Sequence, residues 1–147
     1  MGKAIGKSSF KDKEVIKKTE LKYSKIIKKI DIHLHPKELD PYLDEGVKIM
    51  DKYNVVAGLV HGMPGFLFNK NEEYDVNICV LKAVRKYPNK LYGSVYVDLC
   101  MPIRKCIDLI KKYADFGFKA IKLFPNLGYD PNDDKFDPIW KEVENKK

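Results

Sequence analysis

The chain has 147 residues, of which 44% are hydrophobic, and a formal net charge of +7. This length suits one domain with a sizeable core, and the longest apolar runs are too short to cross a bilayer. No apolar signal core follows the charged N-terminus, and the cysteines Cys79, Cys100 and Cys106 form no C-x-x-C pair. We therefore expect a cytoplasmic protein with reduced thiols and no membrane partner.

The positive charge lies in an N-terminal leader. Residues 1–29 contain ten lysines and three acidic residues, and the remaining chain has 18 basic and 18 acidic residues. The leader has no arginine and lacks the interleaved aromatic residues that stack on nucleic-acid bases, which argues against a nucleic-acid partner. We expect residues 1–25 to form a lysine-rich arm, solvated or helical, and residues 26–147 to form the folded domain.

The predicted domain begins with a strand at residues 26–34 that contains the sequence IDIHLHP. As a strand, this stretch alternates between an apolar face with Ile30, Ile32 and Leu34 and a polar face with Asp31, His33 and His35. Imidazoles two residues apart on a strand point to the same side and can bind one divalent metal, for which we expect zinc. The alternative is that they are merely polar residues at a strand end.

Three more strands and four helices follow in alternation. The predicted strands span residues 55–60, 91–99 and 118–124. The predicted helices begin after Asp40, near Val76, after Pro102 and near Phe136, with Asn54, Pro88 and Gly117 ending the first three. Alternating strands and helices at about 30 residues per unit predict right-handed crossovers and a parallel sheet.

Such a sheet is either an open doubly wound sheet or part of a TIM-type (β/α)8 barrel, which needs about 250 residues. The strands have one apolar face, and the other becomes polar toward the C-terminal ends, where barrel enzymes hold their sites. His61 ends the second strand, Asp98 the third, and Lys122 lies on the fourth. A doubly wound sheet would be apolar on both faces. We therefore predict an α/β fold, the N-terminal half of a barrel with four βα units and parallel strands.

The stretch IDIHLHP resembles the first-strand metal motif of the amidohydrolase superfamily. The later stretches VRKYPNKLYGSVYVD, ADFGFKAIKLFP and NDDKFDPIWKEVENKK are similar to the amidohydrolase-related branch that includes aminocarboxymuconate-semialdehyde decarboxylase. The resemblance covers residues 26–147. H-x-H also begins histidinol-phosphatase-like and TatD-type barrels, and the later stretches favour the amidohydrolase-related branch.

The resemblance implies a role for some residues of this chain. His33 and His35 match the two first-strand metal ligands, and Asp31 matches the acidic residue of the motif, which we interpret as orienting a ligand imidazole. Lys122 matches a position where some amidohydrolases use a carboxylated lysine, and we interpret it here as an interior or substrate-facing lysine. His61 and Asp98 are candidates for the wall of the substrate site or loop residues without a role.

The resemblance further implies hydrolysis of a C–N or related bond, or decarboxylation, on a small carboxylic or amide substrate. Complete members supply more ligands and an aspartate from strands five to eight, so the general base is expected beyond Lys147, and the isolated chain is expected to be inactive. We expect the N-terminal half of such an enzyme, either as a truncated reading frame or as one part of a split barrel that assembles with a partner half-barrel or with a second copy. The competing hypothesis is a non-enzymatic α/β module with structural histidines.

Overall fold

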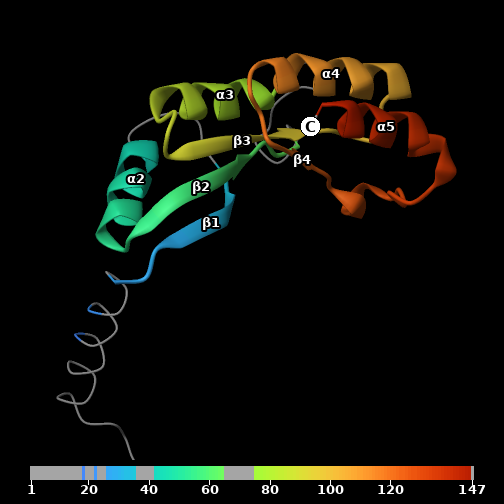
Figure 1. Cartoon of the computed structure of the whole chain (residues 1–147). Helices are drawn as coiled ribbons and strands as arrows, with labels where there is room; N and C mark the ends of the chain where they lie inside the picture. Colours follow the sequence, from blue (N-terminus) through green and yellow to red (C-terminus); the bar gives the residue numbers. More distant parts are fainter. Residues whose placement is uncertain (1–17, 19–21, 23–25, 36–41, 65–74, 147) are drawn as a thin grey trace, which may run out of the picture.

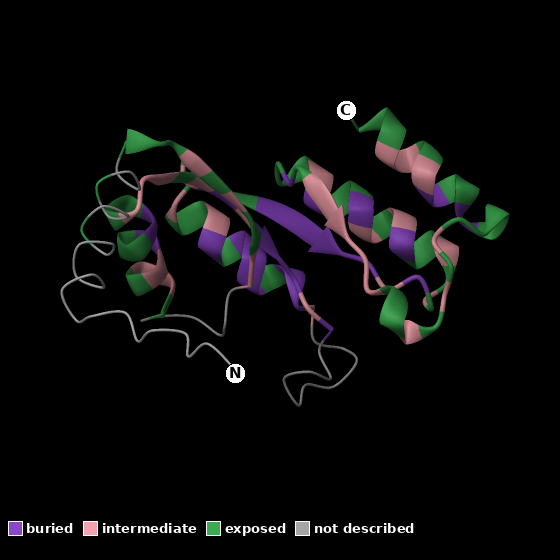
Figure 2. Ribbon diagram, turned by 90° about the horizontal axis from the view of Figure 1, so that it is seen from below, coloured by how far each residue is buried: buried purple, intermediate pink, exposed green. Residues whose placement is uncertain are grey.

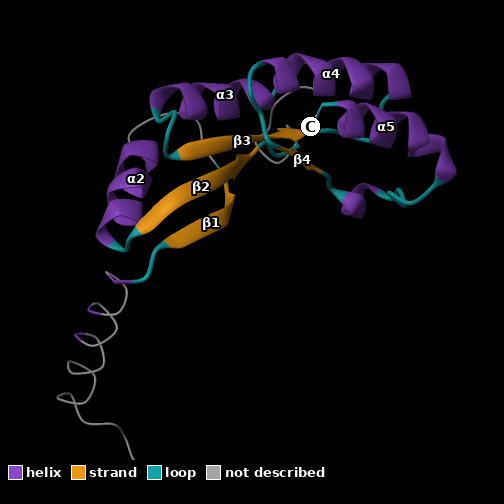
Figure 3. Ribbon diagram, in the orientation of Figure 1, coloured by secondary structure: helices purple, strands orange, loops and turns teal. Residues whose placement is uncertain are grey.

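The computed structural model describes residues 18, 22, 26–35, 42–64 and 75–146 (Figures 1 and 3). Most of the predicted arm, and the predicted helix start at Asp40 and Pro41, lie outside the described residues. Four strands form one parallel sheet in the order β1-β2-β3-β4. Their bounds are β1 Lys29–Leu34, β2 Val55–His61, β3 Leu91–Tyr96 and β4 Ala120–Lys122.

Helices alternate with these strands. They are α2 Tyr42–Lys52, α3 Asn77–Lys86, α4 Ile103–Asp115 and α5 Asp137–Asn145, and short 3-10 turns at Pro125–Leu127 and Asp134–Phe136 connect β4 to α5. The core lies between these helices and the sheet. It joins side chains of the strands, such as Val60 and Val95, to Met50 of α2, Val80 of α3 and Ile110 of α4. Figure 2 shows that burial is greatest along the middle of the sheet and on the helix sides that face it.

The predicted half-barrel is confirmed by this topology. Each strand pairs in parallel with the next strand along the chain, and the sheet curls with its helices packed on one side (Figure 1). A doubly wound sheet instead reverses its strand order at a switch point and carries helices on both faces. The described part of the chain contains four consecutive βα units, which is half of the eight in a closed barrel.

Two helix ends follow from single residues. Asn54 has a positive φ of 56°, the left-handed conformation that asparagine tolerates after a helix. Gly117 has a φ of 86° and ends α4 with a Schellman motif, in which Phe118 N–H bonds Tyr113 O at 3.1 Å and Gly117 N–H bonds Ala114 O at 2.8 Å. The rings of Phe118 and Tyr113 pack with their centroids 4.8 Å apart. Both stops confirm the sequence prediction.

The predicted apolar face of β1 is wrong for two of its three residues. Leu34 packs against the core, but Ile30 and Ile32 are 67% and 71% exposed. The register explains part of the difference, because Ile30 lies beside Ala57, on the side of β2 away from Gly58 and Val60, and pairing shifts again between Asp31 and Leu34. β1 is also an edge strand, and none of the described residues covers Ile30 or Ile32.

Among the described residues, no helix combines the length and apolar character that a bilayer span requires. The predicted strand bounds hold to within a few residues, and β4, at Ala120–Lys122, is the shortest of the described strands. Ladder bonds continue beyond it, from Lys119 N–H to Gly93 O at 2.8 Å and from Val97 N–H to Lys122 O at 3.1 Å. β4 is therefore firmly attached to β3 despite its short span.

Candidate metal centre

The candidate site lies where β1 is irregular. Asp31 pairs with Gly58 and Leu34 with Val60, so three steps along β1 match two along β2, and Ile32 and His33 have no partner in register. Side chains satisfy the backbone groups of this bulge. The carboxylate of Asp31 accepts the His33 backbone N–H at 2.9 Å, and the His61 ring donates from Nε2 to the Ile32 carbonyl at 2.8 Å.

The imidazoles of His33 and His35 face each other across Leu34. Their Nε2 atoms are 2.8 Å apart, and the ring centroids are 4.8 Å apart. His35 Nδ1 donates to the His61 carbonyl at 3.2 Å, since a carbonyl can only accept, so its Nε2 carries a lone pair. A backbone carbonyl that fixes the far ring nitrogen is typical of metal-bound histidines.

The donor set fits a divalent metal. Ligand nitrogens about 2.0–2.1 Å from a tetrahedral zinc stand roughly 3.3 Å apart, so small rotations of the two rings would bring their Nε2 atoms into range. Imidazole suits zinc and its first-row neighbours. Two imidazoles leave such a site short of the three protein ligands that a catalytic zinc usually has. Consistently, no three His, Cys, Asp or Glu side chains within the described part of the chain group into a metal site.

The surroundings of His35 and His61 favour the neutral form of each ring. Burial lowers the pKa of His35, and the neighbouring rings and Lys122 lower it further, while its bond to the His61 carbonyl opposes the change. Burial also lowers the pKa of His61, with Lys122 and His33 acting in the same direction against the bond to Ile32. A neutral imidazole is the form that binds metal, so the environment favours ligation near neutral pH.

The other predicted site residues divide into two groups. His61 lies near the histidine pair, with its ring centroid 5.3 Å from that of His33 and 5.7 Å from that of His35. Lys122 acts on the site through its charge, which lowers the pKa of His35 and His61. Asp98 lies in the loop after β3, where its carboxylate accepts the Cys100 backbone N–H at 2.8 Å. The carboxylate of Asp31 accepts the His33 backbone N–H in this structure. Its role in orienting a ligand imidazole stays a prediction.

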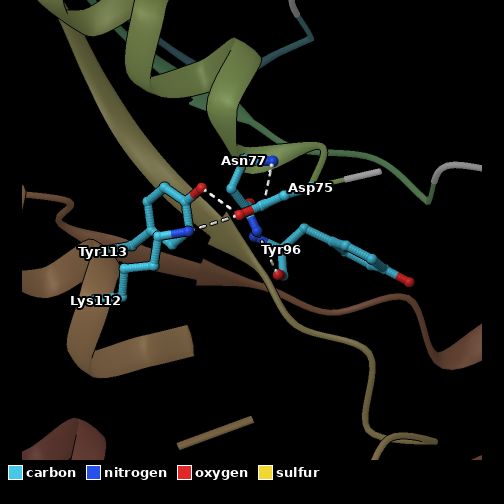
Figure 4. A network of polar contacts seen from close by, with 5 residues as sticks. All are labelled: Asp75, Asn77, Tyr96, Lys112 and Tyr113. Carbon is cyan, nitrogen blue, oxygen red and sulfur yellow. Dashed lines mark hydrogen bonds and ion pairs between the residues drawn. The ribbon is translucent and has the colours of Figure 1, made fainter. Parts of the chain in front are cut away.

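Sequence reasoning missed a buried polar network beside the site (Figure 4). Asn77, at 2% exposure, donates to the Tyr96 carbonyl at 3.0 Å and accepts the Tyr96 N–H at 2.7 Å. Asp75 accepts the Tyr113 hydroxyl at 2.7 Å and Lys112 Nζ at 2.9 Å. The network connects the end of β3 to the start of α3, and the segment just before α3 to the last turn of α4.

This network also fixes the chain that follows His61. A Cβ on Gly62 would lie 2.8 Å from Asn77 Oδ1 and 2.9 Å from Tyr96 Cβ, so only glycine allows this close approach. The end of β2, which carries His61, is therefore held against the end of β3. The sequence signal that could have indicated this network was an asparagine, Asn77, at the first turn of a predicted helix.

A cavity of about 360 Å³ lies between β1 and α2. Among the described residues, the polar side chains that line it are His35 and Tyr42. The rest of this lining is apolar and consists of Leu34, Leu43, Gly46, Val47, Met50, Val60 and Leu91. The cavity offers little to a charged substrate and lies on the core side of the sheet, because Leu34, Val60 and Leu91 belong to or pack on the core. It adds space beside His35 rather than a polar binding site.

The fold places this chain among proteins built on the (β/α)8 plan. No protein-family model matches the sequence, and no curated protein matches it closely. A similar solved structure is a probable 2-pyrone-4,6-dicarboxylic acid hydrolase from Acinetobacter baumannii with citric acid bound. The match has a TM-score of 0.53 at 18% identity and covers 82% of this chain and 47% of the hydrolase. The chain thus spans about half the length of that structure and shares its fold.

Proposed function

We propose that this chain is the metal-binding half of a metal-dependent hydrolase that acts on a small carboxylate-bearing molecule. The observation that carries the proposal is the facing pair of His33 and His35, with the His35 tautomer set by the His61 carbonyl. The likeness of IDIHLHP to the amidohydrolase metal motif and the fold shared with a probable dicarboxylic acid hydrolase support it. Decarboxylation of a similar substrate is the second candidate, on the strength of the later stretches alone.

Each residue has a defined part in this proposal. His33 and His35 would hold the metal, which when bound would polarise a substrate oxygen or lower the pKa of a bound water. Asp31 fixes the backbone beneath His33. The charge of Lys122 lowers the pKa of both His35 and His61, and its ammonium would also attract a substrate carboxylate.

We also propose that the active unit contains a second barrel half, which a second copy or a partner chain could supply. Two imidazoles need at least one more protein ligand and a general base. β1 and β4 are the two edges of the sheet, and β1 exposes Ile30 and Ile32. Unpaired strand edges with apolar side chains invite pairing with another chain.

Cobalt titration of the full chain tests metal binding, because Co²⁺ reports its ligands through visible absorption. Wild type should bind weakly with an imidazole-type spectrum, and His33→Ala or His35→Ala should each abolish binding at this incomplete site. Cys100→Ser is the matched control, since it removes an exposed thiol that could bind metal elsewhere. Unchanged affinity in both histidine variants would refute the proposal.

A further inference from the structure

His61 is bonded to β1 from two of its atoms. Its ring donates from Nε2 to the Ile32 carbonyl at 2.8 Å, and its own carbonyl accepts from His35 Nδ1 at 3.2 Å. The first bond holds the residue before His33, and the second holds the ring of His35. His61 therefore contacts both candidate ligands indirectly or directly: it bonds the backbone just before His33, and it bonds the ring of His35.

The bulge makes the ring bond necessary. Ile32 and His33 have no register partner on β2, so the Ile32 carbonyl has lost its regular ladder position. A carbonyl of this kind costs free energy unless a donor replaces the ladder bond. His61 provides that donor on one side of the bulge, as Asp31 provides an acceptor for His33 N–H on the other.

The Nε2 atom of His61 is not free to bind a metal. Since Nε2 donates to a carbonyl, it carries the proton, and Nδ1 is the remaining acceptor. His61 is 7% exposed, and its Nδ1 is buried with no hydrogen-bond partner among the residues that the structure describes. Within the described residues, no third His, Cys, Asp or Glu joins the pair in a metal-binding group.

We propose that His61 is a positioning residue for the metal pair: it sets the β1 backbone at Ile32 and the ring of His35 without binding the metal. The inference rests on the proposed metal site. The competing role is a third ligand through Nδ1, because the ring centroids of His61 lie only 5.3 and 5.7 Å from those of His33 and His35. Ligand count and tautomer state distinguish the two roles.

Two variants separate the donor from the ring. His61→Gln keeps an N–H donor at a similar reach toward Ile32, whereas His61→Leu keeps the bulk and loses the donor. Loss of an outer hydrogen bond to a metal site typically weakens metal affinity by about 10- to 100-fold. We expect cobalt affinity to fall in that range for His61→Leu and to stay within about threefold of wild type for His61→Gln.

Nitrogen-15 NMR of the wild-type chain gives a readout that needs no variant and no activity. We expect His61 to remain protonated at Nε2, and its Nδ1 signal to stay unchanged, when zinc is added. A zinc-induced shift of His61 Nδ1, or loss of affinity in His61→Gln as large as in His61→Leu, would overturn the positioning role. Wild-type affinity in a folded His61→Leu would overturn it too. If the proposed metal site itself does not exist, His33→Ala and His35→Ala will leave the cobalt affinity unchanged, which is a different result from those above.

Discussion

Replacement of Asn77 should destabilise the whole fold, because its side chain bonds the start of α3 to the end of β3. Asn77→Ala removes the bonds to the Tyr96 N–H and carbonyl, which are 2.7 and 3.0 Å long and buried. Each buried backbone group left without a partner costs about 1–3 kcal/mol. Water entering the vacated space would recover part of this, so we expect a loss of about 2–4 kcal/mol in the free energy of unfolding.

Urea unfolding measures this loss. Far-UV circular dichroism follows the helices, and the fluorescence of the single tryptophan, Trp140 on α5, follows the far end of the domain. The midpoint should fall in both signals while the slope stays unchanged. Lys82→Ala, an exposed change on the same helix, is the control and should stay within about 0.5 kcal/mol of wild type. If Asn77→Ala also stays within that margin, the network does not hold β3 to α3, and our account of how the site is supported fails.

Two further changes probe the packing and the open edge. Gly93→Ala should lower the stability of the fold, measured by thermal unfolding, by about 1–3 kcal/mol, because the new Cβ would lie 2.7–2.9 Å from the Phe118 ring. Adding Phe118→Leu should recover part of this loss, and a melting curve of Gly93→Ala identical to wild type would contradict the close contact. The chain should also elute as a species larger than its 17.0 kDa monomer in light scattering behind a sizing column. The double variant Ile30→Lys/Ile32→Lys should shift the chain toward the monomer, and Ile78→Lys on α3, the control, should not. A wild-type chain that is monomeric and unfolds cooperatively at every protein concentration would argue against a second barrel half.

The sequence was sufficient for the features that depend on local pattern. Strand–helix alternation predicted the half-barrel, and Asn54 and Gly117 predicted two helix ends that have the expected left-handed backbone. The spacing of His33 and His35 predicted imidazoles on one side of β1, and their Nε2 atoms do face each other. These inferences need only the periods of strands and helices and the conformational preferences of single residues.

Features that depend on contacts between strands were not predictable in this way. The prediction for β1 assumed that side chains alternate along a regular strand. It therefore did not include the bulge, the exposure of Ile30 and Ile32, or the bond of Asp31 to the backbone. The contact of His61 with Ile32 depends on the register between β1 and β2. The burial of Tyr96, which is 8% exposed, depends likewise on the contact of β3 with Asn77 at the start of α3.

The most direct test of the metal centre is anomalous diffraction from a crystal of the full chain grown with zinc. We predict a zinc peak about 2.0–2.1 Å from Nε2 of both His33 and His35, with His35 Nδ1 still bonded to the His61 carbonyl and the His61 ring still bonded to Ile32. A zinc ion bound only at Cys100 or in the lysine-rich arm, with the two Nε2 atoms still bonded to each other, would contradict the account.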